Sequence, residues 1–405
     1  MSPKKGGNMV TSTGQVCKPQ SDRDRPYRGF SCPYESFDRT FFSLVVMQYA
    51  TSLIELLLDR FGTLLGDVVV GATDQLAKTN TDNPGNLEVF WSSVPATIMG
   101  ALQTGDAHAA QRAAAELLLH SGANRVPGDW QIQLEQPAVF LWDSWLLPKA
   151  DFLIVQNDGS TANIVASLDG VKSKFRLYWS SEKEIWLTDD LKQLQKVDDG
   201  AYSVSLLLRE ADPGLKCDNQ ILEQISPAGH ESLSRALQLL REVVPQYYTW
   251  VTRVLRRLVI VEAPQNTLRS GNQEGYCGTF YISECLDPLL VAEMFVHESS
   301  HQYYNALIRL EDVTDKSDQT MYYSPFVKRE RTLDRILLAY HAFANVHLFY
   351  QECFNSGVCS REDRKELATL ENDLAAVEQT IITSDKLTPV GRALMEPLYR
   401  EMHHA

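Results

Sequence analysis

The segment from Val291 to Asn305 constrains the fold of this chain most, because it combines a helical run of apolar residues with an H-E-x-x-H motif. His297 and His301 are four residues apart, so on an α-helix their side chains lie on one face, one turn apart. Two imidazoles placed in this way can hold one divalent metal ion, with Glu298 beside it. The alternative is a surface helix on which the two histidines are only polar neighbours. The apolar context favours the metal-binding helix.

The residues before the motif support this interpretation. Asp287 is a suitable N-cap, and Pro288 suits the first position of a helix. Upstream we expect a long helix over Leu233–Leu258, a strand at Leu258–Val261 and a second strand at Gly278–Ser283. This order of helix, strand, strand and helix is similar to the arrangement that zinc peptidases place around their metal.

Composition limits the class of protein. The chain has 405 residues and a formal net charge of −14, which argues against a nucleic-acid partner because phosphate contact requires clustered Lys and Arg. No uninterrupted apolar run approaches the roughly 18 residues of a membrane span, and the first residues lack the apolar core of a signal peptide. The seven cysteines show no C-x-x-C spacing, so free thiols are expected even at Cys353 and Cys359. These features predict a cytoplasmic protein that is not bound to a membrane.

The pattern along the chain predicts an α+β fold in four parts. Residues 1–35 are polar and lack a hydrophobic period, so we expect a disordered tail. Residues 36–125 form a helical region, residues 126–210 a β-rich antiparallel module, and residues 211–405 a mostly helical catalytic domain that carries the H-E-x-x-H helix and short strands. The helices expected in the second part are Phe37–Phe61 and Asp106–His120.

Short alternating runs separated by turn residues define the antiparallel module. The expected strands lie at Ala138–Trp142, Phe152–Val155, Ala162–Ser167, Lys174–Tyr178 and Tyr202–Leu207. Such a module is either purely structural or a platform that holds an extended peptide by strand addition. We favour the structural role.

A catalytic metal requires a third protein ligand besides the two motif histidines. The next expected helix, Thr332–Phe354, carries His341 and His347. His341 shares a stripe with small and apolar residues that can approach the first helix closely, which makes it the favoured ligand. His347, or a carboxylate such as Asp334 or Glu352, remains an alternative.

Four cationic residues precede or begin this helix: Lys328, Arg329, Arg331 and Arg335. A helix start favours acidic side chains over basic ones, so the clustering has a local cost. Binding of a carboxylate by a bidentate guanidinium would account for it, although a solvated surface is the commoner explanation.

Several motifs together resemble the HExxH-motif peptide-modification proteins of ribosomal-peptide natural-product clusters. The matching segments are His297–His301, Tyr323–Phe326, Arg331–Leu333, Tyr340–Phe343 and Leu387–Leu394. The resemblance covers roughly residues 230–400 and implies an enzyme that uses iron(II), 2-oxoglutarate and O₂ to hydroxylate a β-carbon in a precursor peptide. It implies a metal pair, His297 and His301, with His341 as third ligand, and Arg331 as the residue that binds the co-substrate carboxylate. We also place Arg329 and Tyr323 in the co-substrate site. Glu298 is then a weak ligand or a group that orients a histidine.

Two other functions remain open. In a zinc metallopeptidase, Glu298 would act as the general base for a metal-bound water. That class is disfavoured because the second helix lacks a Glu-x-x-x-Asp ligand motif, and Leu307 stands where a metzincin would place a histidine. A peptide-binding scaffold with a degenerate metal site is the third hypothesis, although the intact motif argues against it. A homodimer is compatible with the sequence in each case.

Overall fold

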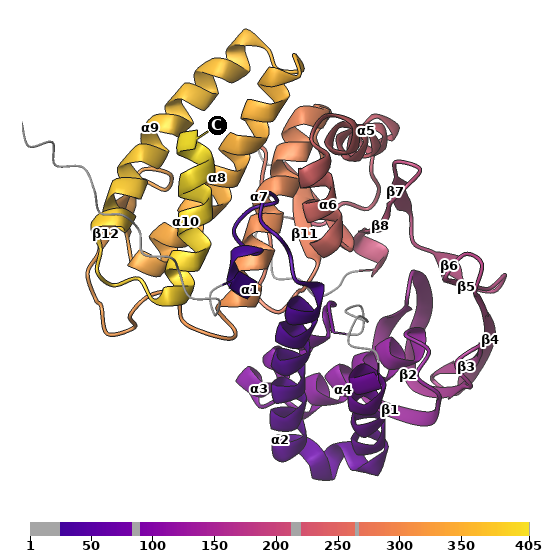
Figure 1. Cartoon of the computed structure of the whole chain (residues 1–405). Coiled ribbons are helices and arrows are strands. Elements are labelled where there is room, and N and C mark those ends of the chain that lie inside the picture. The colour runs from indigo at the N-terminus through magenta and orange to yellow at the C-terminus, as the bar shows by residue number, and fades with distance from the viewer. Residues whose placement is uncertain (1–24, 83–89, 212–219, 264–266, 405) are drawn as a thin grey trace, which may run out of the picture.

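The computed structural model describes residues 25–82, 90–211, 220–263 and 267–404, and over these residues the chain has the expected α+β fold. A mixed sheet lies between the N-terminal and C-terminal groups of helices, and an antiparallel sheet lies beside the N-terminal helices (Figure 1). The H-E-x-x-H helix lies between the mixed sheet and the C-terminal helices, so the candidate site is formed by elements from both.

Of the four N-terminal helices, the first packs against the last helix of the chain, the other three pack on one another, and the second and fourth contact the antiparallel sheet. They are α1 (Arg25–Arg28), α2 (Arg39–Asp82, kinked at Gly66), α3 (Val94–Thr104) and α4 (Ala107–Ala123). The Asp106 carboxylate accepts a hydrogen bond from the His108 amide at 3.1 Å and caps α4, so the helix begins where the sequence predicted.

The first part of α2, Arg39–Gly66, is long and apolar enough to cross a membrane, judged by length and composition alone. The core helix of a soluble protein meets the same criterion. One face of this helix, including Phe42, Val46, Ile54 and Leu57, is buried in the main hydrophobic core. The packing is therefore consistent with a soluble protein.

The expected tail extends less far than predicted. Residues 1–24 lie outside the described residues, but the prediction is wrong for residues 25–35. Phe30, Ser31 and Cys32 are fully buried. The segment lacks a hydrophobic period because it contributes single side chains to the core and not the face of a long helix.

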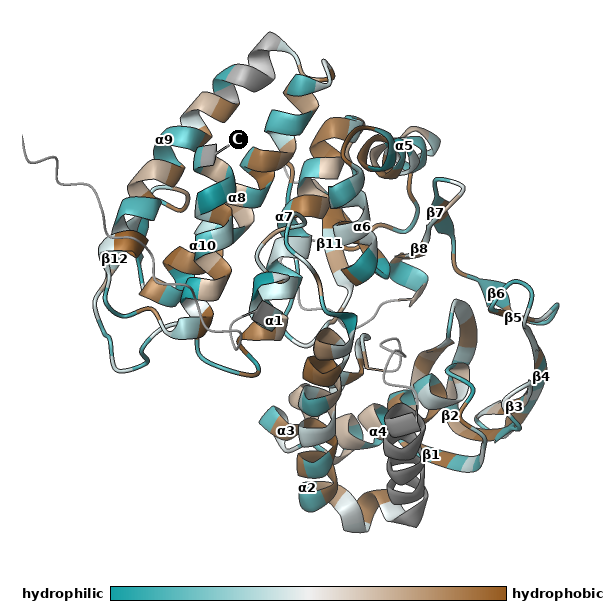
Figure 2. Ribbon diagram, viewed as in Figure 1, coloured by the Kyte–Doolittle hydropathy of each residue, from teal (hydrophilic) through white to brown (hydrophobic). Residues whose placement is uncertain are grey.

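The antiparallel sheet has the strand order β1-β2-β3-β4-β5, and β6 pairs with β2. Its strands are β1 (Gly128–Trp142), β2 (Trp145–Asn157), β3 (Thr161–Leu168), β4 (Val171–Ser180), β5 (Ile185–Leu187) and β6 (Lys192–Gln193). Four of the five strands predicted for this module are confirmed. Strand β4 is mostly hydrophilic (Figure 2), as expected where one face of an antiparallel sheet meets solvent.

The fifth predicted strand, Tyr202–Leu207, belongs to the other sheet, so the prediction that places it in the antiparallel module is wrong. This mixed sheet has the order β10-β11-β9-β8-β7, with β8, β9 and β11 parallel. Its strands are β7 (Lys196–Asp198), β8 (Ser203–Leu207), β9 (Arg257–Val261), β10 (Ser270–Gly271) and β11 (Thr279–Ser283). Val204 and Leu206 face the main core, whereas Leu207 faces a second cluster, because both faces of a parallel sheet are covered.

The long helix predicted over 233–258 is two helices, α5 (Pro227–Val243) and α6 (Pro245–Val254). The break occurs because Pro245 has no amide hydrogen and excludes the helical conformation from the residue before it. The helix prediction was therefore wrong at the residue where a proline marks the boundary.

The rest of the chain carries the site. It comprises α7 (Pro288–Leu307), β12 (Tyr322–Ser324), β13 (Arg329–Arg331), α8 (Leu333–Asn355), α9 (Arg361–Thr383) and α10 (Pro389–His404). Helix α8 packs against α7, α9 and α10. The five described cysteines form no disulfide bond, as predicted, whereas Cys17 and Cys217 lie outside the described residues.

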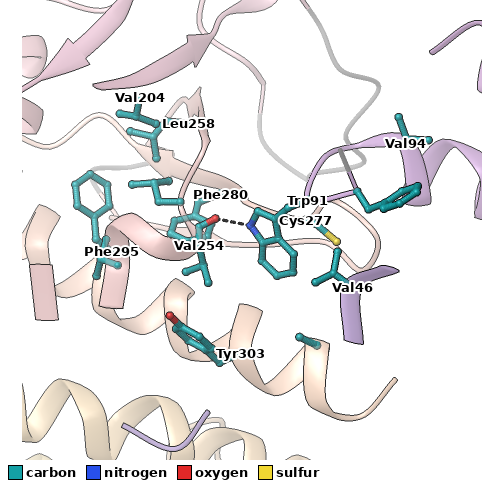
Figure 3. Close-up of a cluster of buried hydrophobic side chains, with 14 of the residues drawn as sticks. Val46, Trp91, Val94, Val204, Val254, Leu258, Cys277, Phe280, Phe295 and Tyr303 are labelled. Atoms are coloured by element: carbon teal, nitrogen blue, oxygen red, sulfur yellow. Dashed lines mark hydrogen bonds between the residues drawn. The ribbon is translucent and has the colours of Figure 1, made fainter. Parts of the chain in front are cut away.

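A buried cluster joins the N-terminal helices to the mixed sheet and α7 (Figure 3). The Trp91 indole donates a hydrogen bond to the carbonyl of Val254 at 2.6 Å. Gly278 has a φ of 72°, and a Cβ there would lie 2.7 Å from the indole nitrogen. Only glycine lets the backbone approach so closely, and this contact fixes the start of β11, the strand that leads into α7.

Candidate functional site

Helix α7 presents the two motif histidines to each other. The Asp287 carboxylate caps the helix by accepting from the Leu289 amide at 2.9 Å, and Pro288 occupies the first turn, as predicted. The Nε2 atoms of His297 and His301 are 3.0 Å apart, and the ring centroids are separated by 4.7 Å. The two nitrogens therefore converge on one point beside the helix.

The electrostatics of the pair match the form of imidazole that binds a metal. Burial lowers the pKa of His297 to about 4. Burial also lowers the pKa of His301 well below its ordinary value, and the nearby His297, His341 and Arg335 lower it further. Both rings are therefore neutral at pH 7, and a neutral imidazole nitrogen is the one that ligates a cation. Two such nitrogens fit one metal ion.

Glu298 is almost fully buried next to the pair. One carboxylate oxygen accepts from the Ser270 hydroxyl at 2.6 Å, and the other accepts from the Asn272 amide at 2.8 Å. Asn305 in turn donates to the Asn272 side chain at 3.2 Å. Burial raises the pKa of Glu298 to about 7, although its hydrogen bonds with Ser270 and Asn272 oppose this effect. Strand β10 and the loop after it therefore hold the carboxylate in place.

Ser270 and Asn272 were missed by sequence reasoning. They lie in a polar segment, and the two-residue strand β10 that returns this segment to the sheet has no hydrophobic period to reveal it. Their role becomes visible only once β10 is paired antiparallel with β11.

His341 is fully buried, but its Nε2 atom faces the N-terminal segment. It lies 2.9 Å from the carbonyl oxygens of Phe30 and Ser31, so Nε2 carries the hydrogen and donates it. Asn345 also donates to the Ser31 carbonyl, at 2.9 Å. Burial lowers the pKa of His341 to about 4, although the hydrogen bonds to these carbonyls oppose this effect. In this arrangement His341 holds the chain segment that follows α1.

The alternative ligands also contact other groups: His347 pairs with Glu371 at 3.0 Å, Asp334 with Arg335 at 3.6 Å, and Glu352 accepts from Tyr34 at 3.4 Å. Within the described ranges, no group of three or more His, Cys, Asp or Glu side chains is placed to hold a metal. The structure thus brings together His297 and His301 but does not add His341 to them. The pair fits a metal ion, whereas a complete three-residue ligand set is not formed.

The hairpin of β12 and β13 carries the cationic cluster. Arg331 pairs with Tyr322 across the hairpin and is half-buried, and the nearby Arg329 and Arg335 have the same charge. Burial and these two cations lower the pKa of Arg331. In the part of the chain that the structure describes, neither Arg329 nor Arg331 forms an ion pair. Tyr323 pairs with Glu330 instead and is 61% exposed.

Strand geometry therefore separates the predicted co-substrate residues. Neighbouring residues of a strand point to opposite faces, so Tyr323 lies on the opposite face of the hairpin from Arg329 and Arg331. The prediction that groups Tyr323 with Arg331 does not agree with this alternation. Arg335 was not among the predicted co-substrate residues, yet its positive charge is close enough to lower the pKa of His301.

Two aromatic rings connect the hairpin to the histidine pair. The Phe343 ring of α8 lies 4.9 Å from the His297 ring, and Phe326 stacks on Phe343 at 4.1 Å. Sequence reasoning did not assign these residues to the site. They form an apolar wall beside the pair.

Comparison with known families and with curated proteins found no family model and no protein that matches this chain.

Proposed function

We propose that this protein is a cytoplasmic metalloenzyme that hydroxylates a β-carbon in a ribosomally made precursor peptide, with iron(II), 2-oxoglutarate and O₂. The observation that carries the proposal is the convergence of the His297 and His301 Nε2 atoms, 3.0 Å apart on two neutral rings. Imidazole nitrogens are suitable ligands for iron(II), and two protein ligands leave positions for a co-substrate.

The cationic cluster supports 2-oxoglutarate as the co-substrate. Arg331 and Arg329 make no ion pair with any described residue, and Arg335 lies within electrostatic reach of His301. A guanidinium binds a carboxylate through two parallel charge-assisted hydrogen bonds. We assign Arg331 to the distal carboxylate, with Arg329 and Arg335 increasing the local positive potential.

When bound, the metal would couple oxidation of 2-oxoglutarate to succinate and CO₂ with insertion of one oxygen atom of O₂ into a peptide C–H bond. The chain's own residues position the reactants. Phe343 and Phe326 limit the access of water to the pair. Ser270 and Asn272 hold Glu298 in a fixed orientation beside the histidines.

A zinc-dependent peptide hydrolase is the second candidate, and the state of Glu298 favours it. A carboxyl group with a pKa of about 7 can take a proton from water at neutral pH, as a general base requires. Water would add to the peptide carbonyl, the C–N bond would break, and the proton would pass to the amine. Strand β10 lies at the edge of the mixed sheet, where an extended peptide can add as a further strand.

One experiment separates the two candidates. Metal-free protein is reconstituted anaerobically with iron(II) or with zinc(II), and O₂, 2-oxoglutarate and a library of peptides are then added. The hydroxylase predicts succinate and a peptide heavier by one oxygen atom, only with iron. The hydrolase predicts two shorter peptides, with zinc and without 2-oxoglutarate. His301→Asn should abolish either activity, and His230→Asn on α5 is the control for loss of a histidine elsewhere. Neither product, or activity unchanged in His301→Asn, would overturn the proposal.

A further inference from the structure

A separate cavity of about 60 Å³ lies on the side of the mixed sheet away from α7. On the usual scale of about 10–15 Å³ per water molecule, it can hold about four or five waters or one small acid group. Its polar side consists of Ser93, Arg112, Glu116, His120 and Arg257, and its apolar side includes Leu141, Leu146 and Leu207. Nothing in the proposed function uses these residues.

Arg257 is the first residue of β9 and points into this cavity. Val259 and Val261, on the same face of the strand, belong to the second hydrophobic cluster, so alternation directs Arg257 to that side of the sheet. The Arg257 side chain is partly buried and is one of the residues that line the cavity. Among the described residues, its guanidinium has neither a hydrogen bond nor an ion pair.

The nearby charges do not pair with Arg257. Glu116 accepts hydrogen bonds from the Thr97 hydroxyl at 2.5 Å and from Arg112 at 3.1 Å, so its oxygens are engaged. Glu116 and Asp143 favour the charged form of Arg257 only from a distance. The Arg257 guanidinium therefore lines the cavity without a bonded carboxylate among the described residues, and a guanidinium in this state can bind a carboxylate through two parallel charge-assisted hydrogen bonds.

A second unpartnered group lines the same cavity. Ser93 occupies the N-cap of α3, but its hydroxyl caps no amide and makes no hydrogen bond with a described residue. The N-terminus of this eleven-residue helix adds a positive partial charge. A hydroxyl donor and a guanidinium thus face one small space.

We propose that this cavity binds the carboxylate of a small organic acid that carries a short aliphatic chain. Arg257 and Ser93 donate to the carboxylate oxygens, and Leu141, Leu146 and Leu207 contact the aliphatic chain. The planar guanidinium matches two carboxylate oxygens. A phosphate would turn further charged oxygens toward the leucines, where they would remain unpaired.

Butyrate is a suitable probe, with binding measured by saturation-transfer NMR on its methyl group. Wild-type protein should saturate the methyl signal, and Arg257→Gln should weaken binding about 10- to 100-fold, the usual effect of losing a hydrogen bond to a charged group. Ser93→Ala, which leaves Arg257 intact, should weaken binding about 2- to 10-fold. Arg235→Gln, an exposed residue that pairs with Glu231, is the control and should bind as wild type does.

The competing anion site at Arg331 is tested in the same way. Arg331→Gln should keep butyrate binding, because that residue lies in the β12–β13 hairpin and not at this cavity. Loss of the signal in Arg331→Gln with retention in Arg257→Gln would overturn the proposal. Absence of saturation in wild-type protein, or displacement of butyrate by equimolar phosphate, would overturn it as well.

Discussion

His341 should make the folded chain sensitive to acid. The ring is fully buried and donates from Nε2 to the carbonyls of Phe30 and Ser31. Its pKa is about 4 in the folded protein, against an ordinary value of 6.5. The pKa of His341 is lower in the folded chain than in the unfolded chain, so protonation of His341 does not affect stability above pH 6.5. Stability is lost as the pH falls from 6.5 towards 4, where the unfolded chain binds the proton more readily.

The size of the effect follows from the two pKa values. The difference between them lowers the free energy of unfolding by about 3 kcal/mol below pH 4, and by about 2 kcal/mol near pH 5. Replacement of His341 by Gln keeps an amide donor and removes the titrating ring. At pH 7.5 we expect the variant to be less stable than wild type by about 1–2 kcal/mol, because the new hydrogen bond is poorly aligned.

Urea unfolding followed by tryptophan fluorescence, with EDTA present to remove metal, measures both free energies. Between pH 7.5 and 5, wild type should lose about 2 kcal/mol more stability than His341→Gln, so at pH 5 the variant should be as stable as wild type or up to about 1 kcal/mol more stable. His230→Gln, whose ring contacts the Lys196 carbonyl, controls for loss of a histidine elsewhere. A difference between wild type and His341→Gln that stays constant over this range would refute the assignment of His341 as a buried neutral donor.

Three further predictions concern other contacts. Asn272→Leu removes a donor to the buried Glu298 carboxylate and should lower the free energy of unfolding by about 1–3 kcal/mol, and an unchanged urea midpoint would contradict this contact. Trp91→Phe leaves a buried carbonyl without its donor and should cost a similar 1–3 kcal/mol; thermal unfolding no lower than in wild type would count against it. In native protein, iodoacetamide should modify the half-exposed Cys359 faster than the buried Cys353, as measured by peptide mass, and equal rates would contradict the packing of α8.

Local signals in the sequence were sufficient to place the H-E-x-x-H helix. Asp287 and Pro288 mark its start, and the four-residue spacing of His297 and His301 sets the face they share. Both are properties of one continuous segment. The proline at 245 was an equally local signal, and neglecting it gave one helix where the structure has two.

The remaining features depend on contacts between distant segments. Strand β8 pairs in parallel with β9, which follows about fifty residues later in the chain, and not with the antiparallel sheet. The alternation of apolar and polar residues within β8 does not distinguish these two pairings. His341 lies on the expected stripe of α8, but the partner of its Nε2 comes from the segment around Phe30, which the polar composition of residues 1–35 concealed. Ser270 became visible only through the position of β10.

Titration of metal-free protein with cobalt(II), followed by visible absorption, tests whether His297 and His301 form a metal site. Wild type and His341→Gln should each bind one ion per chain and His301→Asn should bind none, because the converging Nε2 atoms of His297 and His301 form the site. Equal binding by wild type and His301→Asn, or no binding by wild type, would contradict it.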